Sequence, residues 1–404
     1  MYDIEKIRKD FPILSGEING KPNTFLDSAA SAQKPKAVID KMMQIYSNEY
    51  SNVHRGSYFL SEEITSEYEK SRSIVRKFLN AHKDSEIVFT RNATEAINLV
   101  ASTWGRKFLT KIDEVLISEA EHHANLVPWQ MLRDEIGFEL KIFKINDDGS
   151  FNHDEYCKLL NGRTRLVAVT GMSNVLGTVF PLKQMIEDAH NVGAKVLVDG
   201  CQYVVHNQVD VQDLGCDFLV FSGHKTYGPT GIGVLYGRQE LLEAMPPYQF
   251  GGDMVNVVTY QSTTFDVPPA RFEAGTPAIV QAIGLGTALE YMMSLGMDNI
   301  HSHEAEITSY MRSRLQEIKG VTEVGTAENK GGVFAIDVDG IHPQDLAFVL
   351  DKEGVAVRVG HHCAAPLVRR MGYENLARAS LGLYSDKTDV NRFIAALQKA
   401  QTFF

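Results

Sequence analysis

Five apolar segments of this chain each end in polar side chains of the kinds that take part in catalysis and ligand binding. The ends read Thr90-Arg91-Asn92-Ala93-Thr94-Glu95, Glu121-His122-His123, Ser173-Asn174, Asp199-Gly200-Cys201-Gln202 and Ser222-Gly223-His224-Lys225. In a parallel α/β sheet, ligands bind beyond the carboxyl ends of the strands. We therefore expect these side chains to share one site.

Lys225 and Asp199 indicate the chemistry of that site. Taken alone, Lys225 is equally well explained as a solvated loop lysine, and Asp199 as a residue that caps a turn or binds a metal. A lysine at the base of a cleft, however, forms a Schiff base when burial or nearby cations lower its pKa. On consecutive strand ends, the two residues match the lysine and the acidic ring partner of pyridoxal phosphate (PLP).

The other strand ends supply further groups that such a cofactor would contact. The free N–H groups of a helix start favour a phosphate, a flat ring can stack on the cofactor, and amides can bond to its ring hydroxyl. Each of these residues alone is also an ordinary structural residue. The helix start is Thr94, the added phosphate donors are Ser222 and His224, the stacking ring is His123, and the amides are Asn174 and Gln202.

A last cluster, RVGHHCAAP (358–366), places Cys363 beside histidines and an arginine. Adjacent residues on an irregular loop do not converge easily on one tetrahedral ion, and no C-x-x-C pair exists in the chain, so no metal site is predicted. A cysteine in such surroundings is either a nucleophile with a lowered pKa or a buried, inert thiol. Arg358 ends a strand and can clamp a carboxylate.

Composition narrows the classes of protein. The 404 residues include 40 basic and 51 acidic side chains, a net charge of −11 that opposes binding to nucleic acid. No apolar stretch is long enough to cross a membrane, and the first residues lack the apolar segment of a signal peptide. Four cysteines without paired spacing are typical of free thiols. We expect a cytoplasmic protein that binds neither membranes nor nucleic acid.

The pattern of apolar residues predicts two regions. Between residues 86 and 237, short strands alternate with helices, which favours an α/β domain with a mainly parallel sheet. From residue 276, a long helical region precedes a smaller α+β arrangement. Strands are expected at 86–90, 114–118, 138–145, 165–170, 194–199, 217–222, 231–237, 332–338 and 355–359, and helices at 94–104, 124–136, 181–191, 276–318, 343–353 and 387–401.

Long motifs give the chain a family resemblance. They include LDSAASAQKP (26–35), EHHANLVPWQ (121–130), FSGHKTYGPTGIG (221–233), RFEAGTP (271–277) and RVGHHCAAP (358–366). With these motifs, the sequence resembles the PLP-dependent cysteine desulfurases of the class V aminotransferase family, specifically the SUF-type (group II) branch. Cys201, Tyr203 and Thr226 depart from the residues common in that branch, which leaves the fine shape of the pocket open.

The resemblance implies a fold and an assembly. The fold is that of PLP-dependent transferases of fold type I, with a mainly parallel seven-stranded sheet. Residues 26–275 would form the large PLP-binding domain, and residues 276–404 a small domain that carries the cysteine loop. Residues 1–25 would pack with the small domain. A homodimer is implied, because Thr276 matches a position that reaches the phosphate in the other subunit.

The resemblance also implies the role of each site residue. Lys225 would be the Schiff-base lysine, Cys363 the persulfide-forming nucleophile, and His123 the ring stacked on the cofactor. Asn174, Arg358 and Arg378 would bind the substrate. The implied cofactor contacts are Thr94, Glu95, His123, Asn174, Asp199, Gln202, Ser222, His224, Lys225 and Thr276.

The implied reaction converts L-cysteine to L-alanine and leaves the sulfur as a persulfide on Cys363. A SufE-like or SufU-like acceptor would then carry the sulfur to iron–sulfur cluster assembly. Three alternatives stay open: a selenocysteine lyase acting on L-selenocysteine, another class V enzyme such as an aminotransferase, and a scaffold without activity. Cys363 argues against an aminotransferase, which needs no such nucleophile.

Overall fold

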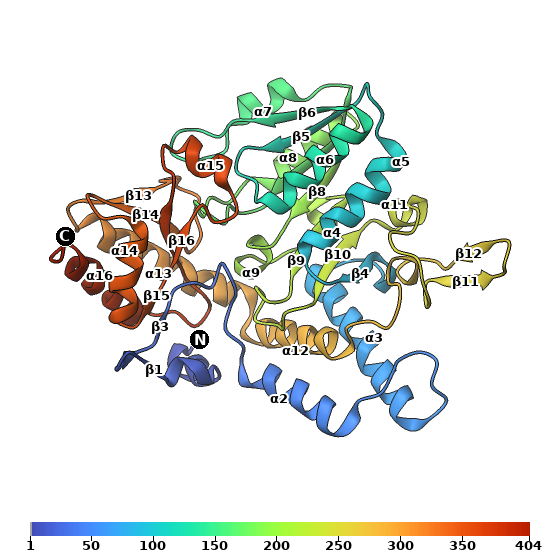
Figure 1. Ribbon diagram of the computed structural model, residues 1–404, viewed down its shortest axis with the longest axis horizontal. Coiled ribbons are helices and arrows are strands. Elements are labelled where there is room, and N and C mark those ends of the chain that lie inside the picture. Colours follow the sequence, from blue (N-terminus) through green and yellow to red (C-terminus); the bar gives the residue numbers. More distant parts are fainter. Residues whose placement is uncertain (1) are drawn as a thin grey trace.

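A seven-stranded sheet forms the centre of the computed structural model, which describes residues 2–404 (Figure 1). The strand β10 runs antiparallel to both of its neighbours, β4 and β9, and the remaining pairs are parallel. The predicted mainly parallel seven-stranded sheet is therefore confirmed. In spatial order the strands are β4 (Ile87–Thr90), β10 (Gly233–Gly237), β9 (Phe218–Ser222), β8 (Lys195–Asp199), β7 (Thr164–Thr170), β5 (Glu114–Ser118) and β6 (Glu139–Phe143).

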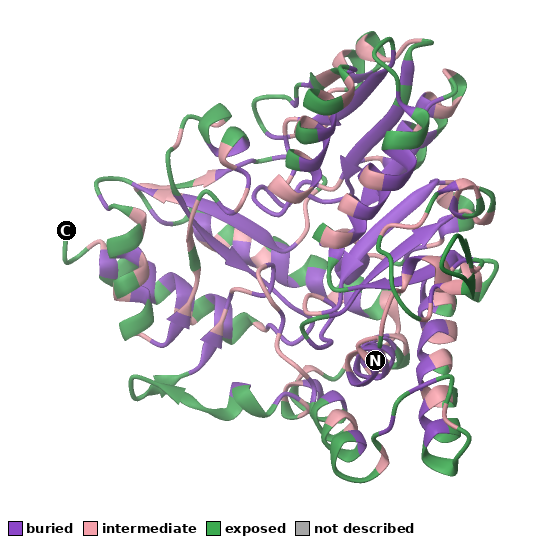
Figure 2. Cartoon of the chain, turned by 45° about the vertical axis from the view of Figure 1, so that its right-hand side comes forward, coloured by how far each residue is buried: buried purple, intermediate pink, exposed green. Residues whose placement is uncertain are grey.

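Apolar runs explain why these segments form the central strands. Every residue of β9 is buried, as expected for a strand with helices on both faces (Figure 2). Along β9 the side chains alternate between two cores. Leu219 and Phe221 belong to the larger core, whereas Phe218 and Val220 belong to the core that contains Trp129. The predicted apolar runs therefore form central strands because both faces of the sheet are buried.

Helices cover both faces of this sheet. The core with Trp129 is closed by α4 (Ala93–Val100) and α6 (Val127–Ile136). The larger core is closed by α3 (Phe59–Leu79), α7 (His153–Leu159), α8 (Leu182–Asn191) and α12 (Ile279–Leu295). Within residues 2–404, no helix combines the length and the apolar character needed to cross a membrane.

A second, four-stranded antiparallel sheet lies at the other end of the molecule (Figure 1). Its order is β13 (Val321–Val324), β14 (Val333–Val338), β17 (Leu376–Ser380) and β16 (Arg358–Gly360). The helices α13 (Met297–Gln316), α14 (Pro343–Lys352) and α16 (Lys387–Ala400) pack on it around Phe334, Ile336 and Phe393. This is the α+β arrangement expected for the C-terminal region.

The N-terminal segment contacts this second sheet region. The short strand β3 (Thr24–Phe25) pairs in parallel with β15 (Val355–Ala356), and Arg8 forms a 2.5 Å ion pair with Asp389 of α16. The boundaries at residues 25 and 275 stay predictions. The helix α12, which lies within the segment 276–404, packs on α3 and on α2 (Lys36–Gln44) of the large region.

Two local predictions were wrong, and four strands in the C-terminal half were not predicted. The helical region 276–318 is two helices, because Gly296 has a positive φ of 85° and ends α12. The strand expected at 355–359 breaks at Val357, so that β15 pairs with β3 and β16 pairs with β17. The strands β13 and β17 were not predicted, nor was the exposed hairpin of β11 (Val255–Val258) and β12 (Thr263–Phe265).

Candidate active site

A cavity of about 220 Å³ lies at the carboxyl ends of β7, β8 and β9. We call it the central cleft. It is the site that the strand ends predicted, because most of the predicted residues line it. The structure brings together Thr94, Asn174, Asp199, Gln202, Ser222, His224, Lys225, Arg358, Cys363 and Arg378.

The paired strands β8 and β9 position the acid and the amine of the cleft. Asp199 is the last residue of β8, is 5% exposed, and accepts a 3.0 Å hydrogen bond from the N–H of Cys201. Lys225 follows β9 in a tight turn, in which its N–H donates to the Ser222 carbonyl. Two side chains with opposite charge are thus held on adjacent strand ends by backbone hydrogen bonds.

The start of α4 supplies donors at the edge of the cleft. Asn92 caps the helix by accepting a hydrogen bond from the N–H of Glu95, and the N–H of Ala93 donates to Ser222 Oγ. At Gly233, on the neighbouring strand β10, a Cβ atom would lie 2.5 Å from the Asn92 Cα. Glycine there lets the helix start approach the sheet, which leaves N–H groups that favour an anion at Thr94.

His122, rather than His123, lines the central cleft. Burial and the neighbouring Lys225 ammonium lower the pKa of His122 to about 4, which keeps its ring neutral. Its Nδ1 accepts the N–H of Ala124, so the neutral ring carries its proton on Nε2. The turn after β5 thus favours the first histidine of the pair as the ring beside the cleft, and the predicted stacking of His123 on the cofactor stays a prediction.

His123 instead holds the cysteine loop. Its backbone N–H donates to the Cys363 carbonyl at 2.7 Å, and its Nε2 accepts the N–H of Ala365 at 3.1 Å. His361 adds a third bond, because its Nδ1 accepts the N–H of Cys363. The loop needs such support, since His362 and Cys363 both have positive φ angles (50° and 55°), which residues other than glycine rarely adopt.

Two arginines form an anion-binding pair in the cleft. Arg358 of β16 and Arg378 of β17 are directly opposite in the antiparallel register. Like charges in this position repel each other, so an anion between them would relieve the repulsion. Arg378 is 2% exposed and donates to the Asn174 carbonyl and to Asp27, while its buried Nε has no partner within residues 2–404. Burial lowers the pKa of Arg378.

The two predicted amides hold backbone carbonyls at the wall of the cleft. Asn174 Nδ2 donates to the His362 carbonyl at 2.8 Å, and Gln202 Nε2 donates to the Ala29 carbonyl at 2.8 Å. Each amide thus keeps its oxygen for another partner. Their positions couple the strand ends to the cysteine loop and to the N-terminal part of the large region.

Glu95 and Thr276 lie outside the central cleft. Both line a separate cavity of about 260 Å³, where Glu95 forms a 3.0 Å ion pair with Arg91. Consecutive helical residues point about 100° apart, so Glu95 turns away from the cleft when Thr94 faces it. The predicted contact of Glu95 with the cofactor therefore has no support from the cleft lining and stays a prediction. The predicted reach of Thr276 toward another subunit stays a prediction.

Cys363 is situated between two cavities. It lines the central cleft and also a neighbouring cavity of about 400 Å³, which is bordered by His123, Val127 and Met131. The second cavity extends from Cys363 toward the surface formed by α4 and α6.

The donor set of the central cleft fits PLP. The cofactor needs a primary amine, a carboxylate for its ring nitrogen, an aromatic ring beside it and phosphate donors. Lys225, Asp199, His122 and the start of α4 provide these groups around one cavity. The unpartnered Nε of Arg378 and the facing Arg358 leave positive charge for an anionic substrate group.

Comparison with known proteins agrees with this geometry. The profile of the class V aminotransferase family (Aminotransferase class-V) matches residues 24–393. A cysteine desulfurase of Dickeya dadantii is 50% identical over 399 residues, which cover 98% of this chain and 97% of that protein. A cysteine desulfurase of Synechococcus elongatus is 48% identical over 99% of this chain, and this chain spans 64% of its length.

Two solved structures share the fold. The cysteine desulfurase CsdA of Escherichia coli superimposes with a TM-score of 0.93 at 38% identity, over 100% of both chains. The apo cysteine desulfurase of Thermococcus onnurineus NA1 superimposes with a TM-score of 0.94 at 36% identity, over 99% of this chain and 98% of that chain. The chain belongs to the class V aminotransferase family. The predicted family and fold type I are confirmed.

Proposed function

We propose that the protein is a PLP-dependent cysteine desulfurase that converts L-cysteine to L-alanine and keeps the sulfur as a persulfide on Cys363. The observation that carries this proposal is the position of Cys363. It faces the same cleft as Lys225, Asp199 and the opposed arginines, on a loop held by His123 and His361. An aminotransferase would have no use for a thiol in this place.

PLP, when bound, supplies an aldehyde carbon for the amino group of the substrate and a ring that accepts electrons. Asp199 would hold a proton on the ring nitrogen, His122 would cover the ring, and the start of α4 with Ser222 and His224 would bind the phosphate. Arg358 and Arg378 orient the substrate carboxylate, and Lys225 Nζ takes the α-proton as a general base. These assignments are proposals for each residue.

The choice between the two cysteines of the cleft follows from their surroundings. Cys201 also lines the cavity, but burial and the adjacent Asp199 carboxylate raise the pKa of its thiol strongly, so it stays protonated. Cys363 is half-buried between two cavities. Its sulfur forms the new S–S bond as the carbon–sulfur bond of the substrate breaks, and the substrate carbon is protonated to give alanine.

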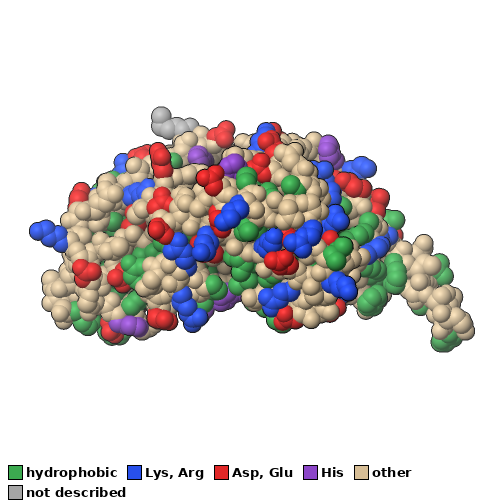
Figure 3. All heavy atoms as spheres, turned by 90° about the horizontal axis from the view of Figure 1, so that it is seen from above, with side chains coloured by type: hydrophobic (Ala, Val, Ile, Leu, Met, Phe, Trp, Pro, Cys, Tyr) green, Lys and Arg blue, Asp and Glu red, His purple; other side chains and the backbone are tan. Residues whose placement is uncertain are grey.

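For the assembly, we propose a homodimer of the SUF type. The hairpin of β11 and β12 projects from the end of the molecule (Figure 3) and exposes Val257, Val258, Tyr260 and Phe265. An exposed apolar hairpin of this kind is typical of a contact surface, and we propose that it packs on the second subunit. The same subunit would receive Thr276. We propose the cytoplasm as the compartment, which agrees with the four free thiols.

For the sulfur acceptor, we propose a SufE-like or SufU-like protein that reaches Cys363 from the side of α4 and α6. The second cavity beside Cys363 supports this direction, because the central cleft is occupied by substrate and cofactor during the reaction.

The test is alanine release from L-cysteine by the purified yellow protein under anaerobic, reducing conditions. Alanine in step with sulfide is expected. Cys363→Ala should keep the cofactor absorption and lose sulfur transfer, and Lys225→Ala should lose alanine formation. Cys216→Ala, which removes a buried thiol of the core, is the matched control and should keep both. Native rates of sulfur transfer in Cys363→Ala would contradict the proposal.

A further inference from the structure

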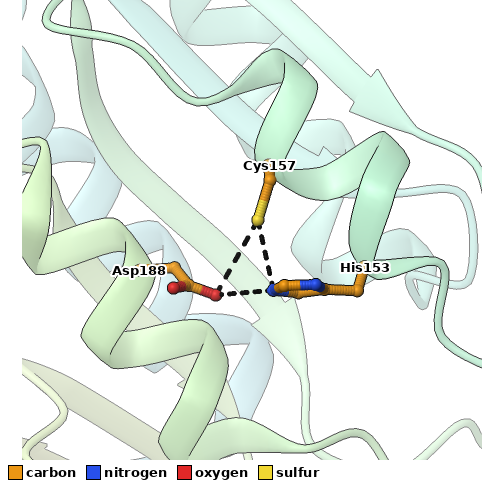
Figure 4. Close-up of side chains that lie close together, drawn as sticks. All are labelled: His153, Cys157 and Asp188. Atoms are coloured by element: carbon orange, nitrogen blue, oxygen red, sulfur yellow. Dashed lines mark hydrogen bonds and ion pairs between the residues drawn. The ribbon is translucent and has the colours of Figure 1, made fainter.

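A surface cluster of nitrogen, sulfur and oxygen ligands lies between α7 and α8, outside the central cleft (Figure 4). His153 and Cys157 are four residues apart on α7, so they share one face of that helix. Gln184 and Asp188 have the same spacing on α8. The two faces meet, and we call His153, Cys157 and Asp188 the α7–α8 cluster.

The three ligand atoms converge as they would around one ion. His153 Nε2 is 3.0 Å from Asp188 Oδ2 and 3.2 Å from Cys157 Sγ, and Sγ is 3.9 Å from Oδ2. Around a tetrahedral Zn²⁺ with ordinary bond lengths, such atoms lie about 3.3–3.6 Å apart. Shifts of a few tenths of an ångström would therefore place the three atoms as ligands of one tetrahedral zinc ion.

The same distances exclude a nucleophilic triad. In a cysteine–histidine–aspartate triad, the nucleophile and the acid contact different ring nitrogens, so that the ring can relay a proton. Here Cys157 and Asp188 both contact His153 Nε2, and Gln184 Nε2 is a third neighbour of the same atom at 3.1 Å. One ring nitrogen has a single proton or a single lone pair. Hydrogen bonding alone cannot satisfy three neighbours, whereas one central cation can.

The scaffold of the cluster is rigid. Tyr156, between the two α7 ligands, is buried, and its hydroxyl donates to the Met185 carbonyl of α8 at 2.7 Å. This bond fixes the two helices against each other at the level of the ligands. The cluster itself is open to solvent, since the His153 side chain is 44% exposed, so an ion can enter directly.

Local charge also favours a cation. Asp154 lies next to His153, and Asp188 is one of the three ligands, so two carboxylates lie at or beside the cluster. Nitrogen, thiolate and carboxylate together are ligands that Zn²⁺ takes, whereas Mg²⁺ and Ca²⁺ prefer oxygen alone.

We propose that the α7–α8 cluster binds one Zn²⁺ ion through His153 Nε2, Cys157 Sγ and Asp188 Oδ2, with water as the fourth ligand. The bound ion joins α7 to α8 and stabilises the folded enzyme by a free energy that rises with the logarithm of its free concentration. The site is independent of desulfuration, because none of its ligands lines the central cleft.

The experiment is equilibrium dialysis of the PLP-loaded, full-length enzyme against Zn²⁺, with bound metal and protein measured by elemental analysis. Four proteins are compared: the native chain, His153→Ala, Cys157→Ala and Cys363→Ala. Cys363→Ala is the control, because Cys363 is a second thiol close to histidines. We expect one equivalent that Cys363→Ala keeps and that His153→Ala and Cys157→Ala both lose. The cofactor absorption band reports that each variant is folded.

A second readout identifies the ligand chemistry. When Co²⁺ replaces Zn²⁺, a thiolate-to-metal band should appear in the native chain and in Cys363→Ala, and it should be absent from Cys157→Ala. The proposal is overturned if the native chain binds no metal. It is also overturned if His153→Ala and Cys157→Ala keep the equivalent, or if only Cys363→Ala loses it.

Discussion

His122 and His123 are adjacent, and the structure gives them different tasks that substitution can separate. His123→Ala removes the hydrogen bond from the N–H of Ala365 to His123 Nε2. One hydrogen bond of this kind contributes about 0.5–1.5 kcal/mol net. At 1.4 kcal/mol per tenfold, this corresponds to about a two- to tenfold loss of the ordered cysteine loop. Sulfur transfer should fall by that factor, and the cofactor spectrum should not change.

His122→Ala should behave differently, because this ring lines the central cleft beside Lys225. Alanine formation should fall more than about 100-fold, the scale of losing a group that acts on the reacting atoms, and the visible band of the cofactor should shift. The assay measures alanine, persulfide on Cys363 and the absorption spectrum for both variants. If His123→Ala shifts the cofactor band and His122→Ala does not, the assignment of the two rings is wrong.

The pH dependence gives an independent check on His123. Burial, with the nearby His361, lowers the pKa of His123, so the folded protein keeps its ring neutral. The bond from Ala365 is therefore fully present above the unfolded value of about 6.5 and is lost as the pH falls toward the lower folded value. The ratio of the sulfur-transfer rate of the native chain to that of the His123→Ala variant should approach one below that pH. A ratio that stays constant across this range would contradict the bond.

Two further predictions concern stability, each measured by urea unfolding. Glu273→Ala removes the carboxylate bound at 2.7 Å to the guanidinium of Arg72, which is 2% exposed and keeps only Glu69 as an acidic partner, and should cost about 3 kcal/mol, the lower end of the range for a broken buried pair. Glu135→Ala is the control, because it removes the partner of the exposed Arg106, and it should cost under about 1 kcal/mol. Gly177→Ala should cost at least about 2 kcal/mol, because φ is 74° and a Cβ would lie 2.6 Å from the Val333 carbonyl; a loss under 0.5 kcal/mol would contradict this close approach.

The central strands could be predicted because burial on both faces demands apolar residues. Glu114–Ser118 (EVLIS) and Phe218–Ser222 (FLVFS) are such runs, and the structure forms β5 and β9 there. The strand β17 could not be predicted in this way. Its sequence LARAS contains small residues and Arg378, whose burial depends on Asp27 and Asn174 from distant parts of the chain.

The site was predicted as a set of strand ends, without the direction in which each side chain points. Side-chain direction depends on the local backbone, which spacing alone does not report. A turn brings His122 to the lining of the cleft, and helical rotation turns Glu95 away from Thr94. The α7–α8 cluster escaped notice for a related reason, since Asp188 comes from a second helix. The expectation of no metal site rested on the 358–366 loop and on the absence of C-x-x-C pairs in the chain, and neither criterion considers ligands from two helices.

The interruption between the strands β15 and β16 at Val357 connects the N-terminal segment to the candidate active site. Residues 24 and 25 pair with β15, the next strand along carries Arg358, and Cys363 follows five residues later. Asp27, just past β3, also forms a 3.1 Å ion pair with Arg378. We therefore expect a change in the first twenty-five residues to reach Arg358 and Cys363 together, so that an N-terminal fusion or truncation should alter the proposed site from a distance.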